Sequence, residues 1–309
     1  MSNLNDGITR RSLIAGVAAA GIVASEIRAN ADTLPGDGPK KSVMWTMLPA
    51  SLSVEERMKL AARTGFAGVE VPPTGDAVEI TRMKAAAAAA GVHIHSVIYG
   101  GWSPPLSSPV AAQAQQCFQG AVDALHCASA YGAEDILLVP AVVDATTTYT
   151  QAWQRSHDAI RRLLPIAERL KITICLEEVW NNFLLSPMEF AAYLDSFHSS
   201  WVRSYFDVGN VVIFGWPQDW VLTLGHRIKK VHLKDYHGGP GLFGGADGHW
   251  ANIGEGSIDW QVLRRAFAEI GFSDYMNLEL ARGDEAYLLD VSRRVDRFLN
   301  GEKPWPVPT

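Results

Sequence analysis

Four apolar stretches in the second half of the chain each carry a carboxylate or an imidazole, side chains that could hold a metal ion. Glu177 and Asp207 end two of these stretches, His232 lies in the third, and Glu279 ends the fourth. A buried charge costs several kcal/mol unless it is paired or bound to a metal. Three carboxylates and one imidazole suit Mn²⁺, Mg²⁺ or Co²⁺ better than a structural zinc ion. The pattern therefore predicts a divalent-metal site, with acids at a protein rim as the alternative.

The elements that must position these side chains are short strands that alternate with longer helices. Short apolar or β-branched runs predict strands at 41–48, 68–71, 93–99, 135–140, 171–178, 202–208, 229–235 and 275–280. Stretches of helical period predict helices at 53–64, 77–90, 110–131, 149–170, 186–197, 217–226, 259–270 and 285–299. Eight strands, each followed by a helix, are the count of a (β/α)8 TIM barrel. We therefore predict an α/β chain with a single TIM-barrel domain at 41–309.

The alternative to a barrel is a doubly wound open sheet. No Gly-x-Gly-x-x-Gly follows the first predicted strand and no P-loop lysine is found, which disfavours that alternative. In a TIM barrel the chemistry lies at the carboxyl ends of the strands. The four candidate ligands lie in or at the ends of four successive strands, so we expect them to converge there.

The bulk composition fits an enzyme of small molecules. Apolar residues make up 48% of the 309 residues, charged residues 19%, and the net charge is −6. An acidic chain is a poor partner for nucleic acid, which requires a basic face. The cysteines Cys117, Cys127 and Cys175 form no CxxC pair, and we interpret them as small core residues.

The first residues have the pattern of an export signal. Arg10 and Arg11 precede an apolar run of about twelve residues, which is too short to span a membrane. A small-x-small site at 29–31 follows, and the paired arginines resemble a twin-arginine signal. We predict a signal peptide at 1–31, a linker at 32–40, and a periplasmic or secreted protein without membrane attachment after cleavage.

Four segments, in order along the chain, resemble the xylose isomerase-like TIM barrel superfamily, in its sugar phosphate isomerase/epimerase and ketose 3-epimerase-like branch. They read LEEVWNNFLLSP (176–187), YFDVGN (205–210), VHLKD (231–235) and GEG (254–256). The resemblance implies that one Mn²⁺-type ion is bound by Glu177, Asp207, His232 and Glu279. Neighbours on a strand face opposite ways, so Glu178 competes with Glu177. We favour Glu177, because the apolar run before it matches the family's run before its ligand.

The resemblance also implies a divalent-metal-dependent sugar isomerase or epimerase that acts on a ketose or keto-sugar. Glu177 and Glu279 would remove and return a proton through a metal-stabilised enediolate. Return to the same carbon gives epimerisation, and return to the neighbouring carbon gives isomerisation. Loss of a leaving group would instead give a lyase or dehydratase of a 3-keto sugar or glycoside. A sugar-binding barrel without chemistry is a further alternative.

Other residues near strand ends are candidates for contacts with the sugar substrate: Glu70, His95, Trp102, Asn210 and Lys234. Asn210 stands where ketose 3-epimerases of this group often have a histidine, which weakens the case for a free-ketose 3-epimerase. Glu255 is either a loop anchor or a hydrogen-bond partner of His232.

Two further expectations concern partners. An exported enzyme would act on free sugars, oxidised sugars or glycosides rather than on sugar phosphates. The superfamily also includes DNA-repair endonucleases, which the acidic charge and Asn210 disfavour. Family members commonly form dimers or tetramers, so a homo-oligomer is compatible with the resemblance.

Overall fold

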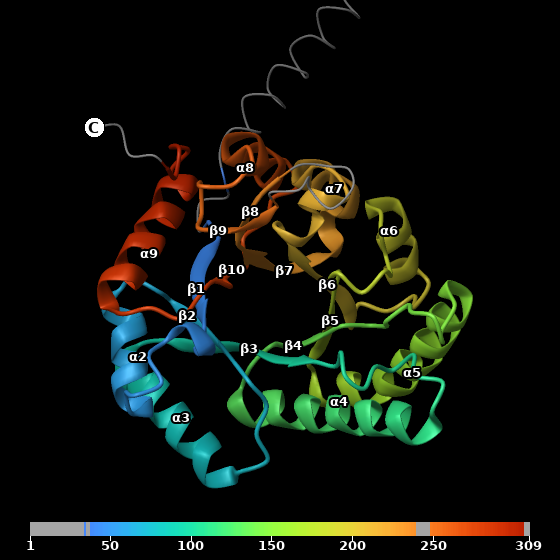
Figure 1. Ribbon diagram of the computed structural model, residues 1–309. Coiled ribbons are helices and arrows are strands. Elements are labelled where there is room, and N and C mark those ends of the chain that lie inside the picture. Colours follow the sequence, from blue (N-terminus) through green and yellow to red (C-terminus); the bar gives the residue numbers. More distant parts are fainter. Residues whose placement is uncertain (1–33, 35–37, 239–247, 306–309) are drawn as a thin grey trace, which may run out of the picture.

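Eight parallel strands close into a barrel, as Figure 1 shows. The computed structural model describes Leu34, residues 38–238 and residues 248–305, so the predicted signal peptide lies outside the described residues. The strands follow one another around the barrel in the order β1-β10-β7-β6-β5-β4-β3-β2. Their bounds are β1 (Lys40–Met44), β2 (Gly68–Val71), β3 (His93–Gly100), β4 (Asp135–Leu138), β5 (Thr173–Glu177), β6 (Val202–Asp207), β7 (Ile228–Leu233) and β10 (Tyr275–Leu278).

The helices form an outer ring around this barrel (Figure 1). They are α2 (Val54–Arg63), α3 (Ala77–Ala90), α4 (Ala111–Tyr131), α5 (Tyr149–Leu170), α6 (Pro187–Asp195), α7 (Pro217–Leu224), α8 (Trp260–Glu269) and α9 (Glu285–Leu299). Short 3₁₀ helices complete the chain: η1 (Trp45–Met47), η2 (Asn210–Ile213) and η3 (Gly225–Arg227). The predicted (β/α)8 TIM barrel is confirmed. No helix among the described residues is long and apolar enough to cross a membrane.

Local sequence signals explain where several helices begin and end. Ser53 forms a capping box with Glu56 at the start of α2, and Ser186 caps α6 ahead of Pro187. Gly91 ends α3 in the left-handed conformation, at φ 71°, which a residue without a Cβ adopts at little cost. These signals fix the lengths of the helices and therefore the places where the strands begin.

The structure differs from the predicted elements at two places beside the carboxyl ends of the strands. The first strand ends at Met44 and continues as η1, so the prediction of a strand to residue 48 is wrong. The backbone turns there because the Leu48 N–H donates to the Trp45 carbonyl at 3.3 Å. The second difference is an antiparallel hairpin of β8 (Asp235–His237) and β9 (His249–Ala251), which the sequence pattern does not predict.

The layer between the strands and the helices is apolar, whereas many side chains inside the barrel are polar. Strand residues such as Val43, Val69 and Ile136 are fully buried against the helices. All three cysteines are free and buried, as expected for core residues. The buried polar residues are concentrated on the inward faces of the strands and at their carboxyl ends, where the candidate site lies.

Candidate metal centre

The four predicted ligands lie together at the carboxyl end of the barrel. Glu177 ends β5, Asp207 ends β6, His232 lies on β7, and Glu279 follows β10. One donor atom of each lies within 4.8 Å of the donors of the other three. The pairing of the strands explains this, since Asp207 stands beside His232 in the register of β6 and β7.

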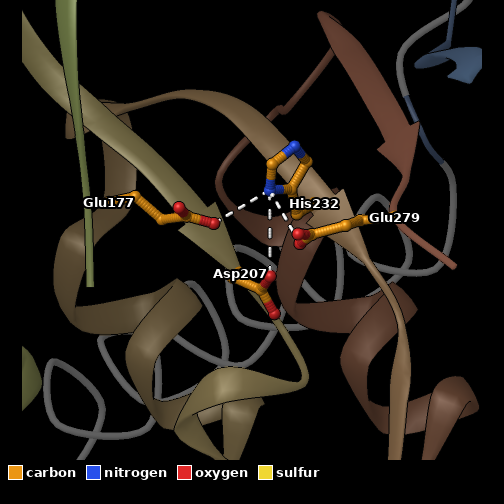
Figure 2. Close-up of side chains that lie close together, drawn as sticks. All are labelled: Glu177, Asp207, His232 and Glu279. Atoms are coloured by element: carbon orange, nitrogen blue, oxygen red, sulfur yellow. Dashed lines mark hydrogen bonds and ion pairs between the residues drawn. The ribbon is translucent and has the colours of Figure 1, made fainter. Parts of the chain in front are cut away.

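The imidazole of His232 is the centre of the cluster, as Figure 2 shows. Its Nδ1 lies 2.8 Å from Glu177 Oε1, 3.2 Å from Glu279 Oε2 and 3.8 Å from Asp207 Oδ2. All three carboxylates therefore point toward one nitrogen. This arrangement of three oxygen donors around an imidazole is a donor set that fits a divalent ion such as Mn²⁺ or Zn²⁺.

Burial and crowding shift the ionisation of the cluster. Burial raises the pKa of Glu177 to about 7, and it also raises the pKa of Asp207. Burial acts against the charged form of His232, but the carboxylates of Glu279, Glu70 and Glu177 outweigh it and raise its pKa well above the usual value. The cluster thus carries excess negative charge and holds protons that a bound cation would displace.

Glu70 contacts the imidazole of His232 on the side away from the cluster. Its Oε2 accepts hydrogen bonds from His232 Nε2 at 2.9 Å and from Asn277 Nδ2 at 3.0 Å, and its Oε1 accepts from Ser96 Oγ at 3.0 Å. A proton held on Nε2 leaves Nδ1 directed at the cluster, which is the tautomer that a metal ligand needs. Glu70 is fully buried among these partners, and its predicted contact with substrate stays a prediction.

The sequence left Glu255 as either a loop anchor or a hydrogen-bond partner of His232. Glu255 instead accepts from Arg294 Nη1 at 2.7 Å and anchors the loop before α8. Glu70 lies in the strand Gly68–Val71, where all four residues are buried in the structure. A carboxylate inside such a strand needs a buried donor, and the imidazole of His232 is one.

Glu177 ends β5 and Glu178 directly follows it, and the two side chains face opposite ways. Glu177 faces the cluster, whereas Glu178 is buried on the other side, and its Oε1 accepts from the Asp207 N–H at 2.7 Å. Burial raises the pKa of Glu178 well above its usual value. The geometry therefore brings Glu177 to the cluster and leaves Glu178 to support the backbone of Asp207.

Lys234 reaches the cluster from the end of β7. Its Nζ lies 2.8 Å from Asp207 Oδ2 and 2.8 Å from Glu279 Oε2. Burial disfavours the charge, but the same carboxylates raise its pKa and keep it an ammonium. A divalent ion held by both carboxylates would compete with this ammonium for their oxygens.

A small cavity of about 220 Å³ opens beside the cluster. Glu177 and Glu279 line it, together with three of the predicted substrate contacts, Trp102, Asn210 and Lys234. Asn210 also holds the site together, because its Nδ2 donates to the carbonyl of Glu178 at 2.9 Å. The cavity thus joins the candidate ligands to polar and aromatic side chains that could hold a small polar molecule.

His95 is not among the residues that line this cavity, and its predicted contact with substrate stays a prediction. Its ring is fully buried and stacks on Tyr275 with 4.2 Å between centroids. Its carbonyl accepts from the Glu134 N–H, which directly precedes β4, so His95 stands near the amino end of the barrel. The sequence placed His95 in the predicted strand 93–99 but did not show how far it lies from the carboxyl end.

Comparisons with known proteins agree with this architecture. A model of the family described as "Xylose isomerase-like TIM barrel" matches residues 58–297. A solved D-tagatose 3-epimerase-like protein is 18% identical with a TM-score of 0.72, and the match covers 84% of this chain and 97% of that one. The 3-keto-D-glucoside 4-epimerase of E. coli is 15% identical with a TM-score of 0.69, over 82% and 97% of the two chains.

A third solved structure, of the IOLI protein with a bound zinc atom, is 15% identical with a TM-score of 0.68, over 84% of this chain and 98% of that one. No curated protein matches the sequence. At these identities the solved structures show the shared fold, and sugar epimerases are among them.

Proposed function

Because the chain belongs to the xylose isomerase-like TIM barrel family, we propose that it is a divalent-metal-dependent sugar isomerase or epimerase. The observation that carries the proposal is the convergence of Glu177, Asp207, His232 and Glu279 within 4.8 Å at the carboxyl end of the barrel. These residues would hold the ion, with Mn²⁺ as the first candidate. Sugar epimerases among the structural neighbours support the proposed activity, and the zinc atom in one neighbour supports a metal site in this fold.

A bound divalent ion would make the C–H bond beside a sugar carbonyl more acidic. The residues of this chain would then move the proton. Glu177 and Glu279 both line the 220 Å³ cavity and approach His232 Nδ1 from two strands, so a sugar between them meets one carboxylate on each side. A carboxylate is a residue type that can accept a proton from carbon and return it.

The other cavity residues would hold and orient the sugar. Trp102 and Trp180 offer aromatic surface, and Lys234 and Asn210 offer hydrogen-bond donors beside the two glutamates. Trp180 is itself fixed, because its Nε1 donates to the Asn210 carbonyl at 3.0 Å. Fixed side chains on several strands provide the orientation that proton transfer between neighbouring carbons requires.

The first experiment measures metal per chain. The purified protein is loaded with Mn²⁺, dialysed and analysed by elemental mass spectrometry, beside His232→Ala and the control His226→Ala, an exposed histidine away from the cluster. We expect about one ion per chain in the wild type and the control, and none in His232→Ala, since the cluster loses its central donor. Circular dichroism verifies that each variant is folded. Equal metal in all three proteins contradicts the assignment of the site.

The second experiment tests the chemistry. The metal-loaded protein is incubated in deuterated water with ketoses and 3-keto glycosides, and exchange of carbon-bound hydrogen is followed by NMR. We expect exchange in the wild type and its loss in Glu177→Gln, which keeps the shape of the side chain but removes its basicity. Products identify the reaction as epimerisation, isomerisation or elimination. Metal binding without any exchange across the sugars contradicts the proposed enzyme and favours a sugar-binding barrel.

Export is a separate proposal that depends on the first residues of the chain. The paired arginines and the apolar run support twin-arginine export to the periplasm. Replacement of Arg10 and Arg11 by lysine should keep the unprocessed chain in the cytoplasm, as seen by cell fractionation. Processing and export at the wild-type level in that variant would contradict the twin-arginine route.

A further inference from the structure

A second, larger cavity adjoins the candidate metal centre. Its volume is about 710 Å³, and it lies between β9 and the segments that lead from β10 into α9. Trp250, Asn252, Glu255, Ala281 and Tyr287 are among the residues that line it. None of these five belongs to the cluster of candidate ligands.

The two cavities meet at a shared wall. Lys234, Trp250 and Glu279 line both of them, so the two cavities are adjacent. Pockets that hold drug-sized molecules measure roughly 300–1,000 Å³. The smaller cavity, at about 220 Å³, falls below this range and the larger one, at about 710 Å³, falls within it. A single sugar ring at the cluster would leave most of this space empty.

Trp250 is a fixed aromatic wall. It stacks on Trp180 with 4.9 Å between ring centroids, and Lys234 Nζ lies 4.6 Å from its ring. The side chain nevertheless stays 47% exposed. An indole that is held in place on one side and open on another offers a flat apolar surface without a further cost in side-chain entropy.

The polar groups of the larger cavity are also held in place. Tyr287 Oη donates to Asn252 Oδ1 at 2.7 Å, and Arg294 Nη1 donates to Glu255 Oε1 at 2.7 Å. Asn252 Nδ2 lies 3.5 Å from the other oxygen of Glu255, so both groups retain capacity to bond a ligand. A flat aromatic surface beside fixed amide and carboxylate groups matches the two faces of a sugar ring, one of C–H groups and one of hydroxyls.

The charge of the larger cavity narrows the ligand further. The carboxylates that line it are already paired with cations, Glu255 with Arg294 and Glu279 with the ammonium of Lys234. A phosphate in this space would be repelled by those carboxylates. A neutral hydroxylated ring would not be repelled.

We propose that the larger cavity binds the second sugar unit of a neutral glycoside, whose reacting keto ring lies in the smaller cavity at Glu177. The inference rests on the proposed function for the reacting ring, and it adds a subsite between Trp250 and Tyr287 for the ring that does not react. The substrate class is then a disaccharide-sized keto-glycoside rather than a free monosaccharide or a sugar phosphate.

The test compares matched sugars that cannot react, so that binding is measured apart from turnover. Titration calorimetry on the Mn²⁺-loaded full chain compares maltose with methyl α-glucoside, cellobiose with methyl β-glucoside, and lactose with methyl β-galactoside. In at least one pair we expect the disaccharide to bind about tenfold more tightly, or better. Equal affinities within every pair, or no binding by any of the sugars, would overturn the second subsite.

A variant that fills the larger cavity tests its location. Ala281 is exposed and lines the larger cavity, whereas it is not among the residues of the smaller one. In Ala281→Trp the preference for the disaccharide should fall toward one, because the indole takes the space of the second ring. The control Ala88→Trp places the same side chain on the exposed surface of α3 and should keep the wild-type preference. A preference that survives Ala281→Trp would overturn the location.

The two proposals fail in distinguishable ways. Hydrogen exchange with both small and large keto-sugars at equal kcat/KM, without a disaccharide preference, retains the enzyme and removes the subsite. A disaccharide preference that Ala281→Trp abolishes, without any hydrogen exchange, retains the subsite and removes the enzyme.

Discussion

Glu70 gives the sharpest test of how the candidate metal centre works, because it touches His232 but does not line the cavity. Its Oε2 accepts from His232 Nε2 at 2.9 Å and from Asn277 Nδ2 at 3.0 Å, and its Oε1 accepts from Ser96 Oγ at 3.0 Å. In Glu70→Gln the amide oxygen can replace Oε2 and the amide nitrogen can donate to Ser96. The substitution therefore removes the charge and keeps the hydrogen bonds.

The expected loss follows from the kind of hydrogen bond that changes. A bond to a charged group contributes about 1.5–3 kcal/mol and a neutral one about 0.5–1.5 kcal/mol. The difference, about 1 kcal/mol or somewhat more, agrees with the 10–100-fold effects found when partners of metal-bound histidines are changed, as an order of magnitude. We expect the affinity for Mn²⁺ to fall about tenfold in Glu70→Gln and about a hundredfold in Glu70→Ala.

Protonation of His232 adds a dependence on pH with a definite sign. Burial opposes the charged ring, but Glu279, Glu70 and Glu177 raise its pKa, so the metal-free imidazole holds a proton that Mn²⁺ must displace. Loss of the Glu70 charge lowers the pKa of His232, so this proton is displaced more easily. At low pH this partly compensates the weaker metal bond, so the deficit of Glu70→Gln should widen as the pH rises.

The assay is a competition titration of Mn²⁺ against a chelating dye at several pH values, on proteins shown to be folded by circular dichroism. Ser96→Ala is the matched control, because it removes a neutral donor from the other oxygen of Glu70 and leaves the bond to His232. It should change the affinity less than about threefold. Equal affinities of Glu70→Gln and the wild type at every pH would refute the argument that Glu70 orients and polarises His232.

Further predictions concern the charges of the site and of the barrel interior. Because burial raises the pKa of Glu177 to about 7 and His232 also holds a proton, Mn²⁺ binding should release protons and tighten at least about tenfold from about pH 6 to about pH 8; an affinity that is constant with pH would contradict this. Lys234→Met should destabilise the metal-free protein by about 3 kcal/mol in urea unfolding, since two carboxylates lose their counter-ion, and Mn²⁺ should restore most of the loss; equal losses with and without Mn²⁺ would be inconsistent. Burial raises the pKa of Asp135 to about 7, against the pull of Lys230 Nζ at 3.6 Å, so the folded state favours its protonated form and the wild type loses stability as the pH rises from the unfolded pKa toward 7. The free energy of unfolding of Asp135→Asn, relative to that of the wild type, should therefore rise by about 2 kcal/mol from about pH 5 to about pH 8. A difference in urea unfolding that does not change with pH would contradict this prediction.

The sequence sufficed for the barrel because two periodicities alternate through most of the chain. The helices Ala77–Ala90, Tyr149–Leu170 and Glu285–Leu299 begin and end where the pattern predicts them. The convergence of the candidate ligands followed from one rule, that the strands of a TIM barrel end on a common face. That these residues bind a metal stays a prediction, which the metal measurement tests.

The sequence could not show how far along the barrel axis a side chain lies, or which residues distant in the chain contact each other. The sequence places His95 in a strand, but its position along the barrel axis depends on the stagger between neighbouring strands. In the structure it lies beside Tyr275. Glu70 and His232 are separated by 162 positions, and no local pattern links them. The hairpin of β8 and β9 was missed because its strands have three residues each, too few for a period to show.

The segment VHLKD shows why its residues belong together. His232 lies on β7 and Lys234 directly follows it, and both reach the cluster, whereas Asp235 begins β8 with its carboxylate buried. That carboxylate accepts from Trp260 Nε1 at 2.8 Å and from the Gly254 N–H at 3.0 Å, and so ties the hairpin to the segment GEG.

Gly256 completes this connection. A Cβ there would stand 2.1 Å from Asp235 Oδ1, so only glycine lets the loop close on the carboxylate. Two segments that resemble the family are therefore one physical contact. It joins the β7 end that carries His232 and Lys234 to the hairpin that carries Trp250, the wall between the two cavities. A substitution at Gly256 should accordingly change the affinity for sugar more than the affinity for the metal ion, because the hairpin moves while the barrel strands stay paired.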